Sequence, residues 1–338
     1  MSKPFISVIM PAFNELDTIE DSIGSVLAQE TPDMEVLLVD GNSTDGTTEA
    51  ISRIAERDNR VRLLHNPHRK TPCAFNIGLS AARGEYVCIF GAHAVYAPDY
   101  IRVCLRELLL HDAVGCSGRI VTVPANRTLQ AQLAAWTLGS RFGSSSRSVR
   151  TRTEGFADTI PYPLFRKQAL LEIGGYDESL DRNQDLDINQ RLRARGYGLY
   201  LTAKTHCGYR GRPTIAALWR YAFHTGSWNG VTLCRKPASM SFRHFVPALF
   251  VTALLVLVGM GAFCEFLQVY STSAVIKALL VLVGVHLTLG VAAGAATAMR
   301  TKAFAPLLLP IVILGFHIAY GWGTLSGLSS KVRVPSHL

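Results

Sequence analysis

The segment VLLVDGNSTDGTTEA at residues 36–50 constrains the fold of this chain more than any other part of the sequence. An apolar run ends in Asp40, and a turn rich in glycine, asparagine, serine and threonine leads through Asp45 to a helical pattern. This order is typical of an open α/β sheet, which binds ligands at the carboxyl ends of its strands. A second apolar run, ISVIM at residues 6–10, passes into PAFNE. The two segments predict a binding site at one sheet edge.

The first 120 residues alternate between strand-like and helix-like segments, as in a sheet covered by helices on both faces. Strands are expected at residues 6–10, 35–39, 61–65, 85–90 and 114–122. Helices are expected at residues 16–27, 47–54, 72–82 and 99–110. The pattern predicts the α/β fold class.

PAFNE at residues 11–15 and the aspartate- and glycine-rich turn at residues 40–47 resemble the inverting glycosyltransferases of family 2. The resemblance implies a GT-A type, Rossmann-like mixed sheet between helices. It also implies that the first edge binds a nucleotide sugar and that Asp40 contacts the nucleotide base. Asp45 either contacts the ligand or caps a helix, since aspartate is a favoured N-cap. The first-edge candidates are Pro11, Ala12, Asn14 and Glu15.

The chain departs from the family where most members carry D-x-D, because it has Gly91, Ala92 and His93 there. The resemblance makes Gly91 and Ala92 donor-binding positions and His93 the metal-binding position. Imidazole suits Mn²⁺ better than Mg²⁺, whose preferred ligands are oxygens. We expect a divalent cation, Mn²⁺ or Mg²⁺, at this place. Residues 66–78 resemble the wall of the nucleotide site, with Arg69 and Lys70 as candidates for phosphate contact.

The stretch NQDLDINQRLRARGY at residues 183–197 resembles the family segment that carries the general base, which makes Asp185 the catalytic candidate. The alternative is that Asp185 is a helix N-cap, and Asp187 is interpreted as an acid of the first helical turn. The positive end of a helix dipole lowers the pKa of a carboxyl, whereas desolvation raises it. GGYDE at residues 174–178 is expected to present the base.

GFADTIPYPLFR at residues 155–166, with Tyr162, resembles the region that lies over the acceptor in one branch of the family. That branch is the bacterial succinoglycan-type exopolysaccharide glycosyltransferases. Residues 137–153 are rich in glycine and serine and contain four arginines, which predicts a loop. This loop is either a mobile lid over the substrate or a surface insertion.

Three runs near the C-terminus, residues 245–264, 278–299 and 303–330, carry no charged side chain. About 20 apolar residues suffice for a helix to cross a bilayer. We therefore expect three transmembrane helices rather than core helices of a soluble domain. Residues 1–11 lack a signal-peptide pattern, and basic residues before the first run and between the second and third favour a cytoplasmic catalytic domain. Lys331 and Arg333 in the tail conflict with an odd number of spans.

The apolar residues of segment 214–223 recur at helical spacing among arginines, which suits a membrane interface. Trp219 and Arg220 are candidates for acceptor or membrane contact. The alternative is a helix packed on the catalytic domain. The net charge of +9 is better explained by lipid headgroups than by nucleic acid, because no zinc-finger spacing or basic helix is present. The seven cysteines are scattered singly. Those of the part expected to be cytoplasmic, Cys73, Cys88, Cys104 and Cys116, are expected to be reduced thiols.

These features predict a GT-A catalytic domain at residues 1–205, an amphipathic interfacial segment at 206–244 and three transmembrane helices at 245–330. The implied enzyme is a multi-pass protein of the bacterial inner (plasma) membrane. It moves a hexose, with UDP-glucose as the first candidate donor, to a polyprenyl-diphosphate-linked saccharide in exopolysaccharide or cell-surface glycan synthesis. Two alternatives stay open: a polyprenyl-phosphate sugar synthase, and a non-catalytic glycosyltransferase-like subunit.

Overall fold

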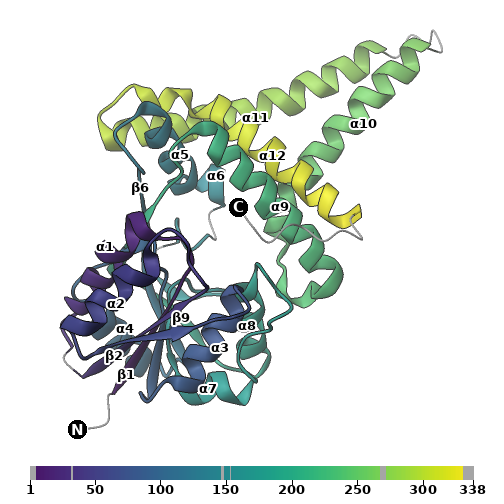
Figure 1. Cartoon of the computed structure of the whole chain (residues 1–338). Coiled ribbons are helices and arrows are strands. Elements are labelled where there is room, and N and C mark those ends of the chain that lie inside the picture. The colour runs from purple at the N-terminus through teal and green to yellow at the C-terminus, as the bar shows by residue number, and fades with distance from the viewer. Residues whose placement is uncertain (1–4, 32, 146–147, 153, 267–271, 330–338) are drawn as a thin grey trace. The chain divides into compact units, whose positions relative to one another are not determined.

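The computed structural model describes residues 5–31, 33–145, 148–152, 154–266 and 272–329 (Figure 1). The chain divides into two compact units. The first comprises residues 1–121 and 152–210, and the second comprises residues 122–151 and 211–338. Residues 122–151 therefore group with the C-terminal helices, whereas the sequence suggested one continuous catalytic domain at residues 1–205.

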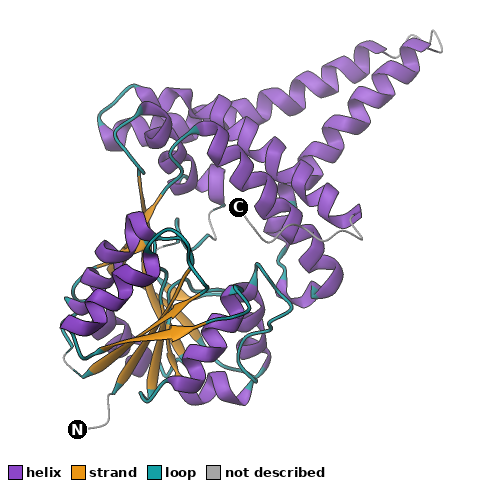
Figure 2. Cartoon of the chain, viewed as in Figure 1, coloured by secondary structure: helices purple, strands orange, loops and turns teal. Residues whose placement is uncertain are grey.

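The described residues of the first unit form one mixed sheet flanked by helices (Figure 2). Its strand order is β3-β2-β1-β4-β8-β6-β9-β5, and β7 pairs with β9. Strands β1 to β4 are mutually parallel, while β8 runs antiparallel to both β4 and β6. The strands are β1 Ile6–Ala12, β2 Met34–Asp40, β3 Val61–His65, β4 Tyr86–Ile89, β5 Ala94–Tyr96, β6 Gly115–Val123, β7 Gly155–Phe156, β8 Leu164–Arg166 and β9 Leu199–Arg210.

The expected strands and helices of the first 120 residues are confirmed to within a few residues. The helices of this unit are α1 Leu16–Leu27, α2 Thr47–Arg57, α3 Thr71–Ala81, α4 Tyr100–Leu110, α7 Lys167–Glu172 and α8 Gln184–Ala194. Their apolar faces pack on buried strands, and one core cluster joins Ile9 and Leu37 to Leu79, Phe165 and Ile188. Parallel strands buried on both faces read as continuous apolar runs, which is why β1, β2 and β4 are recognisable in the sequence.

The strand register brings the candidate site together. Pro11 and Ala12 close β1 opposite Val39 and Asp40 of β2, and Asp40 pairs in turn with His65 of β3. Gly91 follows β4, which pairs with β1 on its other side. The carboxyl ends of the parallel strands thus form one edge, called the donor edge below, at residues 11–15, 40–47, 66–70 and 91–93.

The second unit is helical among its described residues. It comprises α5 Leu129–Gly139, α6 Arg141–Ser144, α9 Ile215–Arg235, α10 Val246–Phe266, α11 Thr272–Thr301 and α12 Leu309–Ser329, with short 3₁₀ turns Pro237–Ser239, Phe242–His244 and Ala305–Leu308. Within the described part of the chain, three stretches are long and apolar enough to cross a membrane: Val246–Phe266, Ser273–Thr301 and Ala305–Ser329.

The prediction of a loop at residues 137–153 is wrong for the first half of this segment, which forms the end of α5 and all of α6. The hydroxyl of Thr128 accepts from Ala131 N–H at the start of α5, and that of Ser140 accepts from Gly143 N–H at the start of α6. Leu138 is buried in an apolar cluster with Leu218 and Ile313. Capping and tertiary packing override the glycine- and serine-rich composition. Residues 146, 147 and 153 lie outside the described residues.

Helix α9 packs along α12, the last of the three apolar helices. Gly226 and Gly230 of α9 face Gly323 and Gly327 of α12 so closely that an added Cβ at any of them would overlap a backbone oxygen of the facing helix. Small residues allow such close approach of membrane helices. The segment expected to lie at the membrane interface is therefore bound to an apolar helix along much of its length. Residues 330–338, including Lys331 and Arg333, lie outside the described residues.

Candidate functional site

Asp40, at the end of β2, is held by its own turn. Its Oδ1 accepts from Ser43 Oγ at 2.6 Å, and its Oδ2 accepts from Thr48 Oγ1 at 3.0 Å and from Ser43 N–H at 3.2 Å. Its side chain is buried, with 3% exposure. Gly41 N–H donates to Ala12 O at 2.9 Å, which joins the ends of β1 and β2. The Asp40 carboxyl is thus held in a fixed position at the donor edge.

Asn14 and Asp45 connect the two edge segments. Asn14 Oδ1 accepts from Thr44 N–H at 2.9 Å, and Asn14 N–H donates to Ser43 Oγ at 3.0 Å. Asp45 accepts from Leu16 N–H at 3.1 Å and from the N–H and hydroxyl of Thr47. Asp45 therefore satisfies N–H groups at the starts of both α1 and α2, which supports its structural interpretation.

These bonds also set the ionisation of Asp45. Desolvation acts to raise the pKa of its carboxyl, but the hydrogen bonds from Thr47 and Leu16 outweigh it and hold this pKa below the usual value. The carboxylate is consequently stabilised in its charged form, as hydrogen bonding to an anion requires.

Gly91 is glycine for a steric reason. A Cβ at this position would lie 2.9 Å from Cε1 of Tyr162, so the space that an aspartate would need is filled by the Tyr162 ring. Tyr162 has a φ of 46°. Its carbonyl accepts from the hydroxyl of Tyr100 at 2.9 Å. The sequence associated Tyr162 with the acceptor, and the structure places it against Gly91 at the donor edge.

Two buried tyrosines that the sequence did not single out support this corner. Tyr96 OH accepts from Gly91 N–H at 2.7 Å, and Tyr100 OH accepts from Gly118 N–H at 3.0 Å. The Tyr96 ring stacks on Phe90 with 3.8 Å between centroids. Ala92 is buried, and its carbonyl accepts from Ser22 Oγ at 2.8 Å. The contacts of Tyr100 with Gly118 and of Ser22 with Ala92 join residues that are distant in the sequence, so no local pattern could have indicated them.

His93 and Glu15 form the open pair of the donor edge. His93 Nδ1 lies 3.3 Å from Glu15 Oε1, and the His93 side chain is 44% exposed. Desolvation acts to raise the pKa of Glu15, but the hydrogen bond and charge of His93, with the hydroxyl of Thr18, hold this pKa below its usual value. In the part of the chain that the structure describes, no group of three or more His, Cys, Asp or Glu is placed to hold a metal ion. A cation at this pair would need further ligands from a substrate.

Asp185 lies in the first turn of α8 and is exposed. The N-cap of α8 is Asn183, so the alternative interpretation of Asp185 as the cap is wrong. Desolvation by the surrounding protein raises the pKa of the Asp185 carboxyl, and the bond from Leu186 N–H at 2.9 Å offsets only part of this rise. An accessible carboxyl with a raised pKa is suited to accept a proton.

Asp187 has the structural role that the sequence suggested. Its side chain is 1% exposed, and its Oδ2 accepts from Arg191 Nε at 2.8 Å. Asp185 and Asp187, two residues apart in α8, therefore differ sharply, because Asp187 is buried and Asp185 is exposed.

Lys70, a candidate for phosphate contact, forms an ion pair with Asp181, with 3.0 Å between Nζ and Oδ1.

In the second unit, Trp219 and Arg220 are both exposed on α9. Trp219 Nε1 donates to Val312 O of α12 at 3.1 Å, and its indole lies against Gly315. The expected contact of Trp219 and Arg220 with acceptor or membrane stays a prediction.

Comparison with known proteins defines the class. The sequence model described as Glycosyl transferase family 2 matches residues 7–174. The chain is 31% identical over 249 residues to the succinoglycan biosynthesis protein ExoA of Rhizobium meliloti (strain 1021), which covers 71% of this chain and 73% of that protein. The chain belongs to glycosyltransferase family 2. It is therefore a transferase, as the sequence predicted.

Two further relatives match nearly the whole chain. One is the dolichyl N-acetyl-alpha-D-glucosaminyl phosphate 3-beta-D-2,3-diacetamido-2,3-dideoxy-beta-D-glucuronosyltransferase of Methanococcus voltae, 24% identical over 96% of this chain and 97% of that protein. The other is the solved structure of the mannosyltransferase PcManGT from Pyrobaculum calidifontis in complex with GDP-Man and Mn²⁺. It has a TM-score of 0.57 and 21% identity, over 95% of this chain and 88% of that chain. This likeness confirms the predicted GT-A fold.

Proposed function

We propose that this protein transfers a hexose, with inversion, from a nucleotide sugar to a lipid-linked saccharide at the cytoplasmic face of a bacterial plasma membrane. The observation that carries the proposal is Asp185, an accessible carboxyl with a raised pKa in a chain of this family. A general base for an acceptor hydroxyl needs access to substrate and a pKa nearer to neutrality than an ordinary aspartate has.

The proposed reaction is a single displacement. Asp185 takes the proton of the acceptor hydroxyl while the acceptor oxygen forms a bond to C1 of the sugar. The bond from C1 to the nucleotide diphosphate breaks, and the electron pair leaves with the diphosphate. Attack opposite the leaving group inverts the configuration at C1. Asp187 takes no part, because it is buried in its pair with Arg191.

The donor edge is the proposed site of the nucleotide sugar. Pro11, Ala12, Asn14, Glu15 and Asp40 lie at this edge, with Gly91 and Ala92 beside them. Their common position supports nucleotide binding, as the family implies. UDP-glucose is the first donor to test, and GDP-mannose is the second because the solved mannosyltransferase was bound to GDP-Man.

A divalent cation, Mn²⁺ or Mg²⁺, is proposed at Glu15 and His93. The pair supplies one carboxylate oxygen and one imidazole nitrogen within 3.3 Å of each other. This mixed donor set fits Mn²⁺ better than Mg²⁺. When bound, the ion would neutralise charge on the diphosphate leaving group. The two residues would hold it together with diphosphate oxygens.

The three apolar helices support a membrane-bound acceptor and contact with membrane lipids. The apolar window of α10 is only 11% buried within the protein, and that of α11 is 17% buried. Arg235, Lys236 and Arg243 precede α10, which favours a cytoplasmic start of the first span. The related protein from Rhizobium meliloti is named for succinoglycan biosynthesis, and the one from Methanococcus voltae for a dolichyl-linked acceptor. A polyprenyl-diphosphate-linked saccharide in exopolysaccharide or cell-surface glycan synthesis is the corresponding acceptor here.

Nucleotide release by the purified protein in lipid tests this proposal. A panel of UDP- and GDP-sugars is supplied with a bacterial membrane lipid extract, in Mn²⁺, Mg²⁺ or EDTA. Release that requires lipid, metal and Asp185 supports the proposed transfer and identifies the donor. Release to a polyprenyl phosphate that survives Asp185→Asn supports the polyprenyl-phosphate sugar synthase instead, because a phosphate acceptor needs no general base. Binding of UDP without release from any sugar supports a non-catalytic subunit.

A further inference from the structure

The turn at residues 173–183, called the base turn below, joins α7 to α8 and leads directly to Asp185. One side chain of α3 holds it. Asn76 Nδ2 donates to Tyr176 O and to Glu178 Oε1, each at 2.9 Å, and Asn76 Oδ1 accepts from Tyr176 N–H at 2.8 Å. The amide thus pairs with both backbone groups of Tyr176, as a neighbouring strand would. The Asn76 side chain thus anchors this turn to α3.

Helix α8 holds the base turn from its own side. Arg191 donates to Ile173 O at 2.8 Å and to Gly175 O at 2.7 Å, while its Nε is bound by the buried Asp187. Gly175 has a φ of +69°, and a Cβ there would lie 2.6 Å from Asn76 Oδ1. Between these two anchors there is room for backbone alone. The position of the turn is therefore determined by Asn76 and Arg191 together.

Tyr176 connects this clamp to Asp185. Its ring is buried and lies 4.7 Å from the ring of Phe75, centroid to centroid. Burial raises the pKa of the Tyr176 hydroxyl, and the negative charge of Asp185 raises it further. The residue whose backbone Asn76 holds is thus an electrostatic neighbour of the proposed base. A shift of Tyr176 would change the surroundings of Asp185.

Lys70 provides a second connection to the base turn. Its Nζ lies 3.0 Å from Asp181 Oδ1 and 3.5 Å from Glu178 O. Lys70 directly precedes α3 and ends the loop whose Asn66 N–H donates to Asp40 O at 2.8 Å. The ion pair therefore links the donor edge at Asp40 to the turn that carries the base.

We propose that Asn76 is a positioning residue that fixes Asp185 for proton abstraction, and that the Lys70–Asp181 pair ties this turn to the donor edge. The inference rests on the proposed function of Asp185. It differs from the sequence interpretation, in which residues 66–78 wall the nucleotide. The two polar atoms of the Asn76 amide are bonded to the base turn.

Steady-state kinetics of Asn76→Ala in lipid is the first test. A misplacement of about 1 Å in a reacting group can cost on the order of 100-fold in rate. We expect kcat to fall by about 10- to 100-fold, with KM for the donor little changed. The acidic limb of the pH profile should also move to lower pH, because a loosened turn lessens the desolvation that raises the pKa of the Asp185 carboxyl. A rise in donor KM with unchanged kcat would mean that Asn76 contacts the nucleotide, and would overturn the proposal.

A rescue pair makes the test specific. Asn76→Asp places a carboxylate opposite Glu178 and the carbonyl of Tyr176, so it should lower kcat at least as much as Asn76→Ala. Adding Glu178→Gln supplies an amide donor to the new carboxylate and should restore part of kcat. A purely nucleotide-binding role of Asn76 predicts no such recovery. No recovery in a folded double variant would contradict the proposal.

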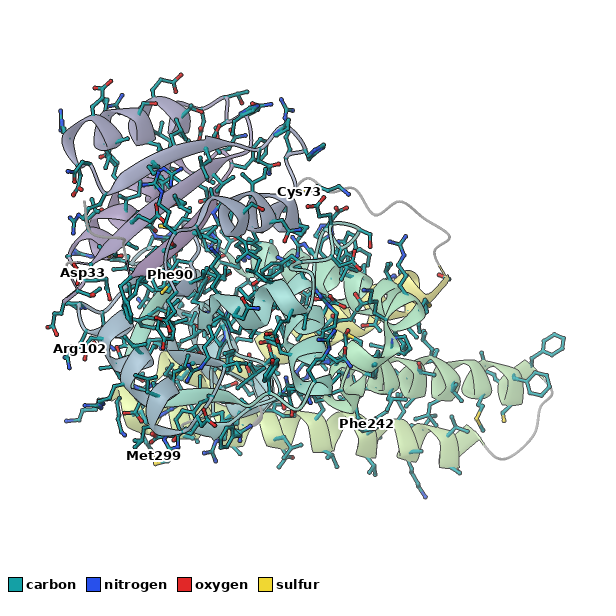
Figure 3. All side chains as sticks on the ribbon, turned by 90° about the horizontal axis from the view of Figure 1, so that it is seen from below. Asp33, Cys73, Phe90, Arg102, Phe242 and Met299 are labelled. Carbon is teal, nitrogen blue, oxygen red and sulfur yellow. The ribbon has the colours of Figure 1, made fainter. Side chains whose placement is uncertain are left out.

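Arg102→Ala is the matched control; Figure 3 labels this residue. Arg102 Nε lies 2.8 Å from Oε2 of Glu30 in an exposed ion pair, and Glu30 precedes β2, at the end of the sheet opposite the donor edge. It should leave kcat unchanged. If Asn76→Ala does not fold, Lys70→Ala and Asp181→Ala test whether contacts to the base turn support kcat. Each should lower kcat by a few-fold, and the double variant should lose no more than the larger single effect. Unchanged kcat in both folded single variants would overturn the proposal, whereas absence of release by the wild type would instead contradict the proposed function.

Discussion

Two aspartate-rich helix starts in the first unit have opposite chemical character. In the turn at residues 40–47, Asp40 and Asp45 accept hydrogen bonds from neighbouring hydroxyls and N–H groups, and the pKa of Asp45 is lowered. At the start of α8, Asp185 is exposed and its pKa is raised by desolvation. The position of an aspartate in a motif therefore does not by itself show whether its carboxylate is structural or reactive. Its hydrogen bonds and its desolvation do.

The largest expected effect comes from the same substitution made in both turns. Asp185→Asn removes the proposed base and should lower kcat by about 100- to 10,000-fold. Asp45→Asn keeps one acceptor oxygen, which can serve either Leu16 N–H or the N–H and hydroxyl of Thr47. It should lower stability but keep kcat within a few-fold of wild type. Donor binding, measured by calorimetry, should persist in both variants. Equal losses of kcat would break the comparison, because they would give Asp45 a share in the chemistry.

A smaller effect is expected at the open pair of the donor edge. His93→Ala removes the imidazole nitrogen beside Glu15 and should raise the Mn²⁺ concentration for half-maximal activity by at least about tenfold. EDTA should abolish release by the wild type. Titration of activity with Mn²⁺ and Mg²⁺ measures both effects. If EDTA does not lower the activity of the wild type and His93→Ala does not lower activity either, the proposed role of the metal ion is contradicted.

The smallest effect is on stability, and its sign should differ between the two turns. The lowered pKa of Asp45 contributes stability that is present above the unfolded pKa and is lost as pH falls through the folded pKa. Asp45→Ala should therefore lower the free energy of unfolding near neutral pH, and lower it less at acidic pH, where the carboxyl is protonated. Thermal unfolding of the protein in detergent at several pH values measures this decrease.

The pH-dependent contribution of Asp185 to stability should have the opposite sign. Its pKa is raised on folding, so it lowers stability as pH rises from the unfolded pKa through the folded pKa. Asp185→Asn should consequently raise the unfolding temperature near neutral pH and have no such effect at acidic pH. A loss of stability in this variant would show that Asp185 is a structural residue.

The sequence predicted much of this architecture because the central strands are continuous buried runs. It also placed Asp40 at a strand end and Asp45 and Asp185 at helix starts, where local patterns are informative. Strand β9 was missed because Lys204, Thr205 and His206 interrupt its apolar residues. The fit of Tyr162 against Gly91 and the bonds of Asn76 to Tyr176 join distant segments. No local periodicity encodes such contacts, so they became visible only in three dimensions.

Helix α9 shows the same limit in the second unit. The spacing of Leu218 and Ala222 correctly indicated a helix with an apolar face, and both side chains are buried. The sequence left open whether this face meets the membrane or the catalytic domain. The described contacts of the second unit place it on α5 and α12, with glycines at the closest approach to α12. Which element covers an apolar face is decided by tertiary structure and not by its spacing.

The assignment of Asp185 as the general base is tested by the pH dependence of kcat/KM for nucleotide release. A general base at Asp185 predicts an acidic limb that lies above the usual range of aspartate, and a residual activity in Asp185→Asn that lacks this limb. The same limb should persist in Asp45→Asn. An acidic limb unchanged by Asp185→Asn would contradict the assignment of Asp185 as the general base.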